Sequence, residues 1–126
     1  NIRILPGATV ESSVADVERI IDDPAVKVRV FEGNDPAPVS PASGEAWDVV
    51  ADSIREVFPT AEVAPYVMLQ ASDSRHFAKI SDNVYRFLPF DLRQDELESI
   101  HGINERIRTS TYRGAVAFYD ALVGRL

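Results

Sequence analysis

The alternation of hydrophobic and polar positions along the chain predicts short strands in four places. Val26, Val28 and Val30 alternate with their neighbours, which is typical of a half-buried strand. Residues 66–69 form a continuous hydrophobic run, which favours a strand covered on both faces, as in parallel α/β sheets. The predicted strands are at residues 1–5, 26–31, 66–70 and 84–88.

Helices are predicted where hydrophobic residues recur every three or four positions. The clearest is capped by Ser110 or Thr111. Its predicted apolar face is Tyr112, Ala115, Val116, Tyr119, Leu122, Val123 and Leu126. The others run from a cap at Ser12 and Ser13 to Asp22, from about Ser43 to Pro59 and over residues 73–80, with a turn at 95–99. Strands alternating with helices predict an α/β fold: a partial α/β sheet with flanking helices, preceded by a strand–helix–strand unit.

One segment has the composition of a linker. Residues 33–44 are rich in proline, glycine, serine and asparagine, which is typical of the connection between two domains. We therefore predict a domain boundary here, with a first domain at residues 1–35 and a second at residues 36–126.

Charge and residue usage exclude several classes of protein. Thirteen basic residues against twenty acidic ones give a net charge of -7, which argues against nucleic-acid binding. The absence of cysteine excludes disulfides, thiol nucleophiles and cysteine-based zinc sites. No hydrophobic run approaches the roughly 20 residues that span a bilayer, and no signal-peptide pattern is present. A cytoplasmic protein without a membrane partner is expected, and the lack of an initiator methionine suggests a piece of a longer chain.

Two polar segments are candidates for binding an anion. Ser72 and Arg75 follow the third predicted strand, and ligands of open α/β sheets bind at the carboxyl ends of strands. An arginine there can hold a carboxylate through two parallel hydrogen bonds. The alternative is that Asp73 caps a helix and Arg75 is a solvated surface residue. Asn1 and Arg3 lie on the first predicted strand, where an arginine is more often an exposed edge charge.

His101 is a candidate metal ligand, because the neighbouring Gly102 lets the backbone bend sharply and present the imidazole. Glu105 could orient a neighbouring group or pair with Arg106. The alternative is an ordinary surface loop, since one histidine cannot define a site that needs three or four ligands. The acidic pair at residues 95–96 is interpreted as solvated charge.

Five segments, taken in order, carry a resemblance to a known family: residues 1–7, 72–75, 84–89, 101–106 and 118–122. Together they resemble the second half of the zinc-dependent aminoacylase, carboxypeptidase S and succinyl-diaminopimelate desuccinylase family of metallopeptidases. The resemblance covers nearly the whole chain. The Tyr-Arg-Phe segment followed by His-Gly-x-Asn-Glu is most similar to the carboxypeptidase S branch.

The resemblance implies roles for individual residues. His101 matches the family's last zinc-ligating histidine. Arg75 matches the arginine that binds the substrate's carboxylate, and Arg3 matches an arginine that reaches the same carboxylate when a lid domain closes. Asn1 and Ser72 are assigned to the same substrate-binding set.

The resemblance also implies an activity for the intact protein. The family uses two zinc ions to hydrolyse the amide bond of N-acyl amino acids or of C-terminal peptide bonds, so a small-molecule or peptide substrate with a free carboxylate is expected. Residues 1–35 match the end of the lid domain, which also allows a homodimer, and residues 36–126 match the last part of the catalytic domain. Glu105 matches an acidic residue near the ligand, with a supporting role.

No catalytic residue is assigned in this chain. The family's other zinc ligands and its general base belong to motifs that this sequence does not contain, and a catalytic zinc needs three protein ligands. We therefore expect the chain alone to lack hydrolase activity and a tight zinc site. The competing class is a non-catalytic ligand-binding or dimerisation module, and a family member that has lost catalysis is a further alternative.

Overall fold

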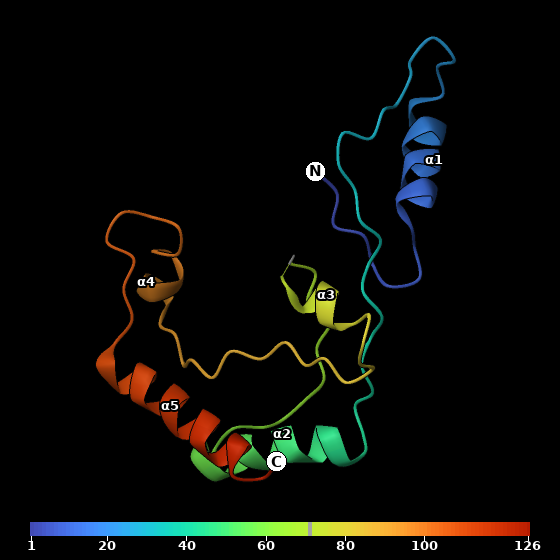
Figure 1. The fold of residues 1–126 in the computed structure, drawn as a ribbon. Helices are drawn as coiled ribbons and strands as arrows, with labels where there is room; N and C mark the ends of the chain where they lie inside the picture. Colours follow the sequence, from blue (N-terminus) through green and yellow to red (C-terminus); the bar gives the residue numbers. More distant parts are fainter. Residues whose placement is uncertain (71) are drawn as a thin grey trace. The chain divides into compact units, whose positions relative to one another are not determined.

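The computed structural model describes residues 1–70 and 72–126, and every regular element in these ranges is a helix (Figure 1). The predicted α/β fold is therefore wrong: the described residues are all-helical and contain no strand. The helices are α1 (Val10–Ile21), α2 (Glu45–Val57), α3 (Ser74–Phe77), α4 (Gln94–Leu97) and α5 (Thr109–Val123).

The four segments predicted as strands have irregular backbone instead. A strand is held by hydrogen bonds to the main chain of a neighbouring strand, and no such ladder joins the described segments. At Val84 the Ser40 side chain stands in for a partner strand. The Ser40 hydroxyl accepts from the Val84 N–H at 2.8 Å and donates to its carbonyl at 3.2 Å. Tyr66 is 83% exposed, so the expected cover on both faces of its hydrophobic run is missing as well.

The chain divides into two compact units, and each is described by itself. Unit 1 comprises Asn1–Ser40 and Tyr66–Tyr85, and contains α1 and α3. Unit 2 comprises Pro41–Pro65 and Arg86–Leu126, and contains α2, α4 and α5. The predicted domains, residues 1–35 and residues 36–126, stay a prediction.

In unit 1, α1 begins one turn earlier than its predicted cap. Thr9 is the N-cap, and its hydroxyl accepts from the Ser12 N–H at 3.0 Å. The Ser12 hydroxyl in turn accepts from the Thr9 N–H at 2.9 Å, which completes a reciprocal capping box. Asp35 accepts from the free Val10 N–H at 2.8 Å. The helix ends where expected, at Asp22, whose φ of 47° lies in the left-handed region.

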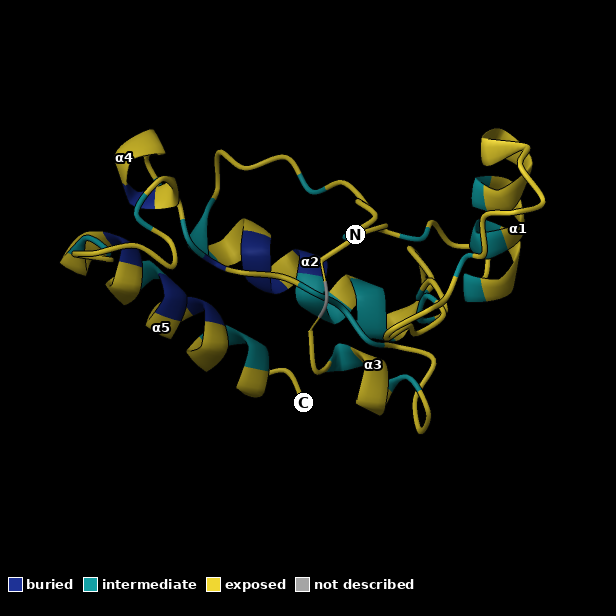
Figure 2. Ribbon diagram, turned by 90° about the horizontal axis from the view of Figure 1, so that it is seen from above, coloured by how far each residue is buried: buried dark blue, intermediate teal, exposed yellow. Residues whose placement is uncertain are grey.

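In unit 2, α2 and α5 pack against each other and enclose the hydrophobic core (Figure 2). Phe118 is 2% exposed, and its ring meets the Phe87 ring with centroids 5.0 Å apart. Gly114 lets the helices approach, because a Cβ atom there would lie 3.2 Å from the Phe58 ring. The buried hydrophobic side chains among the described residues are Ala51, Ile54, Ala115 and Phe118.

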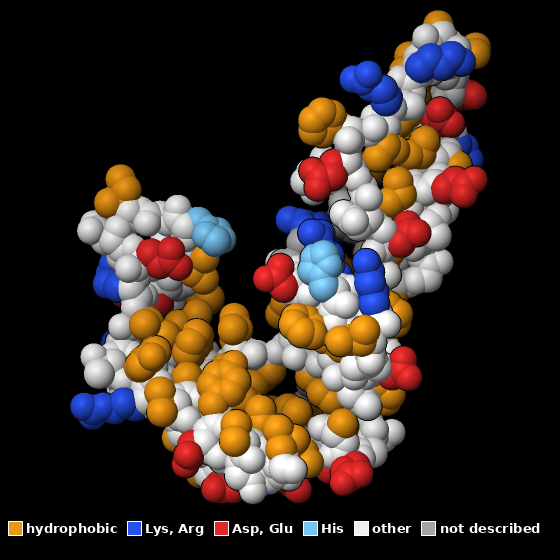
Figure 3. Space-filling view, viewed as in Figure 1, with side chains coloured by type: hydrophobic (Ala, Val, Ile, Leu, Met, Phe, Trp, Pro, Cys, Tyr) orange, Lys and Arg blue, Asp and Glu red, His pale blue; other side chains and the backbone are white. Residues whose placement is uncertain are grey.

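The face of α5 next to the buried one is exposed, and hydrophobic side chains gather on the surface over this helix (Figure 3). The predicted apolar face mixed the two sides of α5: Ala115 is buried, whereas much of the rest is exposed, and the buried Phe118 was missed. No helix of the described chain is both long enough and apolar enough to cross a membrane. The exposed members of the predicted apolar face are Tyr112, Val116, Tyr119, Val123 and Leu126.

Candidate functional site

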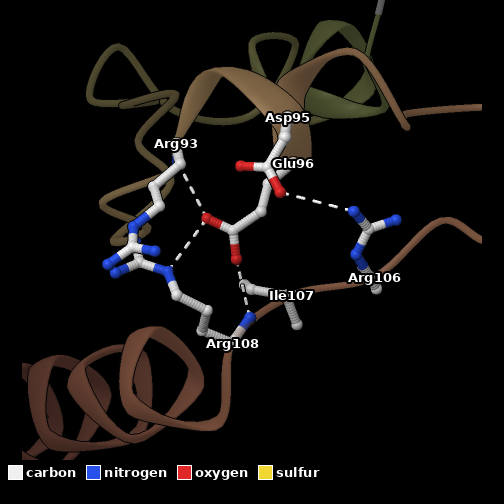
Figure 4. Close-up of a pocket in the computed structure, with 6 residues that line it drawn as sticks. All are labelled: Arg93, Asp95, Glu96, Arg106, Ile107 and Arg108. Carbon is white, nitrogen blue, oxygen red and sulfur yellow. Dashed lines mark hydrogen bonds and ion pairs between the residues drawn. The ribbon is translucent and has the colours of Figure 1, made fainter.

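The candidate site is the segment at residues 93–108 of unit 2, which contains α4, leads into α5 and carries His101. The buried side chain of Glu96, only 3% exposed, lies where the two ends of this segment meet, and we call this part of the segment its base. Glu96 Oε2 accepts from the Arg93 N–H at 2.8 Å and from Arg108 Nε at 3.1 Å, while Oε1 accepts from the Arg108 N–H at 2.7 Å (Figure 4). Because Arg93 precedes α4 and Arg108 precedes α5, one carboxylate ties both ends of the segment together.

The Arg108 side chain also bonds to Asp91, which precedes the segment. Its Nη2 donates to the Asp91 carbonyl, which also accepts from the Thr111 hydroxyl at 3.3 Å. A shallow pocket of about 140 Å³ lies over the same base. Its lining is Arg93, Asp95, Glu96, Arg106, Ile107 and Arg108 (Figure 4).

The hydrogen bonds at Glu96 hold the pKa of its carboxyl below the ordinary value of 4.5. The largest cause is the Arg93 N–H, which donates to the charged form. Burial opposes this effect, and the main-chain and side-chain donors of Arg108, with its positive charge, act in the same direction as Arg93. A carboxylate stabilised in this way is ionised in the folded protein at neutral pH.

Acid should weaken the fold through Glu96. A folded-state pKa below the unfolded one means that Glu96 stabilises the fold above pH 4.5 and that this contribution is lost as pH falls through the folded value. Glu96→Gln removes the titration, so we expect the variant to be less stable than the parent at neutral pH and this difference to shrink in acid. Denaturant unfolding at a series of pH values measures the difference, and a constant difference would contradict the assignment.

Above the base, two further contacts close the segment. Arg106 Nη2 lies 3.3 Å from Asp95 Oδ2, so Arg106 pairs with Asp95 and not with Glu105 (Figure 4). At the tip, Glu105 Oε2 accepts from the main-chain N–H of His101 at 3.2 Å. His101 and Asn104 both adopt positive φ, 62° and 66°. Residues other than glycine seldom adopt this conformation, so the tip has a specific and partly strained turn.

The His101 side chain is exposed, and neither ring nitrogen has a hydrogen-bond partner among the described residues. An imidazole of this kind fits one position of a metal site, because a nitrogen lone pair is free and the turn beneath it is held. It does not make a site alone: within the described ranges, no group of three or more histidine, aspartate or glutamate side chains could hold a metal ion.

The predicted carboxylate-binding residues belong to unit 1 and are all exposed. Arg75, in α3, donates from Nε to His76 Nε2 at 3.3 Å, and Ser72 Oγ lies 2.6 Å from Ser74 Oγ. The alternative interpretation was that Asp73 caps a helix, but its side chain makes no capping hydrogen bond. In the part of the chain that is described, no hydrogen bond or ion pair joins the predicted substrate-binding pairs, namely Asn1 and Arg3 to Ser72 and Arg75.

Comparison with curated proteins finds relatives over nearly the whole chain. The probable carboxypeptidase S-like 2 of Dictyostelium discoideum is 33% identical over 124 residues, which cover 98% of this chain and 24% of that protein. The N-fatty-acyl-amino acid synthase/hydrolase PM20D1 of Xenopus tropicalis is 36% identical over 124 residues, with the same coverage. Its human counterpart is 32% identical over 126 residues, covering 98% and 25%. The chain belongs to the aminoacylase and carboxypeptidase S family.

Membership of the aminoacylase and carboxypeptidase S family confirms the resemblance that the motifs predicted. The chain spans about a quarter of the length of the curated relatives that it matches. No family model matches it, and no solved structure matches it. The roles of His101, Arg75 and Arg3 stay predictions.

Sequence reasoning missed the residue that organises this family member's candidate site. Glu96 was interpreted with Asp95 as solvated charge, and that interpretation is right for Asp95, whose side chain is 62% exposed, and wrong for Glu96. The spacing Arg93-x-x-Glu96 is the one available signal, because a glutamate three residues after a helix N-cap often accepts the cap's N–H. Nothing local indicated that Arg108, twelve residues later, would supply the other donors.

Proposed function

We propose that this chain is part of a zinc-dependent amidohydrolase that cleaves the amide bond of N-acyl amino acids or of C-terminal peptide bonds. The observation that carries the proposal is the similarity to carboxypeptidase S-like and N-fatty-acyl-amino acid synthase/hydrolase proteins over 98% of the chain. The exposed His101 imidazole, on a turn held at its base and tip, supports it.

His101 would be one ligand of a site that holds two zinc ions in the intact protein. The remaining ligands would come from residues outside this chain. Lewis-acid activation of water and of the amide carbonyl is the chemistry that bound zinc would supply. Within this chain, the 93–108 segment would hold the imidazole in place. The chain alone would be inactive, because it contributes neither the remaining ligands nor a general base.

The substrate's free carboxylate would be held by Arg75, assisted by Arg3, Asn1 and Ser72. A guanidinium suits this task because its parallel N–H groups match the two carboxylate oxygens. Fixing that end of the substrate orients the scissile amide. In this proposal residues 1–35 are the end of a lid domain that could also mediate a homodimer, and residues 36–126 belong to the catalytic domain. A cytoplasmic location remains part of the proposal, on the sequence argument alone.

The experiment is a kinetic comparison in the full-length protein. Arg75→Ala is expected to lower kcat/KM for an N-acyl amino acid by roughly 10- to 150-fold, because a hydrogen bond to a charged group contributes about 1.5–3 kcal/mol. The same substrate with its carboxylate converted to a carboxamide should be hydrolysed poorly by the parent and lose little more in the variant.

Arg113→Ala is the matched control, since Arg113 is an exposed arginine on α5. It should leave kcat/KM unchanged. Equal activity of the Arg75→Ala variant and the parent on the free carboxylate would refute the assigned role. A full-length protein that retains no zinc and hydrolyses no amide would favour the non-catalytic ligand-binding or dimerisation module.

A further inference from the structure

The turn at His101 has a main-chain conformation that needs support. Its φ of 62° places a residue with a Cβ atom in the left-handed region, where such residues are uncommon. A conformation of this kind persists when surrounding contacts hold it, and it often occurs at functional sites. The main-chain N–H of His101 is held by one acceptor among the described residues, the Glu105 carboxylate at 3.2 Å.

Hydrogen bonds within the rest of the segment hold the residues on which this turn is built. The Gly102 N–H donates to the Ser99 carbonyl at 2.8 Å, and the Ser99 N–H and hydroxyl both donate to the Glu96 carbonyl, at 3.2 Å and 2.8 Å. Glu96 is itself anchored to Arg108 through its side chain. A chain of hydrogen bonds therefore runs from the buried base to the residue after His101. The His101 N–H is not part of this chain of bonds, and its acceptor is the Glu105 carboxylate.

We propose that Glu105 is a positioning residue for His101: by accepting the His101 main-chain N–H, its carboxylate holds the left-handed turn that presents the imidazole. This inference rests on the proposed role of His101 as a metal ligand and adds the residue that sets the ligand's direction. Groups that orient a metal-binding histidine typically contribute 10- to 100-fold to metal affinity.

The role predicts a difference between two substitutions at the same position. Glu105→Ala removes the acceptor, whereas Glu105→Gln keeps an amide oxygen at the same reach, and that oxygen can still accept the His101 N–H. A residue that acts by its negative charge, or that binds the metal directly, would lose its function in both variants. Rescue by glutamine therefore separates positioning from direct coordination.

The experiment uses the full-length protein and three measurements. Zinc affinity is determined by competition with a chelator, ligand geometry by the absorption spectrum of the cobalt-substituted protein, and the stability of the turn by amide hydrogen exchange of the metal-free protein. In Glu105→Ala we expect roughly 10-fold weaker zinc binding, a changed cobalt spectrum and faster exchange at residue 101. Glu105→Gln should resemble the parent in all three.

Glu98→Gln is the matched control, because Glu98 is an exposed glutamate of the same segment that accepts from Gln94 Nε2 at 2.8 Å. It should behave as the parent. If Glu105→Ala also behaves as the parent, or if Glu105→Gln loses as much zinc affinity as Glu105→Ala, the positioning role is refuted. His101→Ala, measured alongside, tests the proposed function separately: unchanged zinc affinity in that variant would overturn the ligand assignment itself.

Discussion

His101→Ala in the full-length protein is expected to weaken zinc retention by more than about 100-fold, beyond the range that substitutions in the outer shell of a metal site produce. The physical reason is that a catalytic zinc has three protein ligands, so losing one removes a third of the coordination that holds it. The exposed imidazole has no competing partner among the described residues, which leaves it available to a metal ion. Zinc content after dialysis, together with amide hydrolysis, measures the effect.

His76→Ala is the control for this experiment. It removes the other histidine of the chain, which is also exposed and whose Nε2 accepts from the Arg75 side chain. This variant should keep the parent's zinc content. Full zinc retention by the His101 variant, or equal losses in the two variants, would contradict a specific ligand role for His101.

Phe118→Ala is expected to lower the free energy of unfolding by about 3–5 kcal/mol, the usual cost of truncating a buried phenylalanine. Phe118 is 2% exposed, and it lies in the core that α5 and α2 enclose. Its ring contacts Phe87 and Tyr119 at centroid distances of 5.0 Å and 5.2 Å, so the truncation also removes two aromatic contacts. Denaturant unfolding followed by circular dichroism gives the difference.

Tyr112→Ala is the matched control, since Tyr112 is an aromatic residue of the same helix that is 57% exposed. Surface substitutions usually change stability by no more than about 0.5 kcal/mol, and we expect a change of that size. If the two variants were equally destabilised, the assignment of Phe118 to the core and of Tyr112 to the surface would be wrong.

The helices were largely predictable because their signals are local. The segment from about Ser43 to Pro59 contains α2, and the predicted turn at 95–99 overlaps α4. Spacing alone did not show which face of α5 is buried. That helix has hydrophobic residues on both sides, and the choice between Phe118 and Tyr119 depends on where α2 lies.

The strands were not predictable in the same way. A strand needs a partner to accept its hydrogen bonds, and alternation such as that of Val26, Val28 and Val30 says nothing about where a partner is. In the described residues these segments stay irregular, and at Val84 a single serine side chain satisfies the main chain. A pattern of side chains therefore predicted an element whose existence depends on the backbone of another segment.

By itself, the sequence determined the family and the helical segments, because motif order and hydrophobic spacing are properties of neighbouring residues. Only the tertiary structure decided that Glu96 is buried and bonded to Arg108, that the Glu105 carboxylate accepts the His101 N–H, and that four expected strands are absent from the described residues. The two glutamate contacts depend on atoms brought together across a helix junction or a turn, and a strand depends on a partner segment. Hydrogen bonding and burial act over a few ångströms in space, and separation along the chain does not specify them.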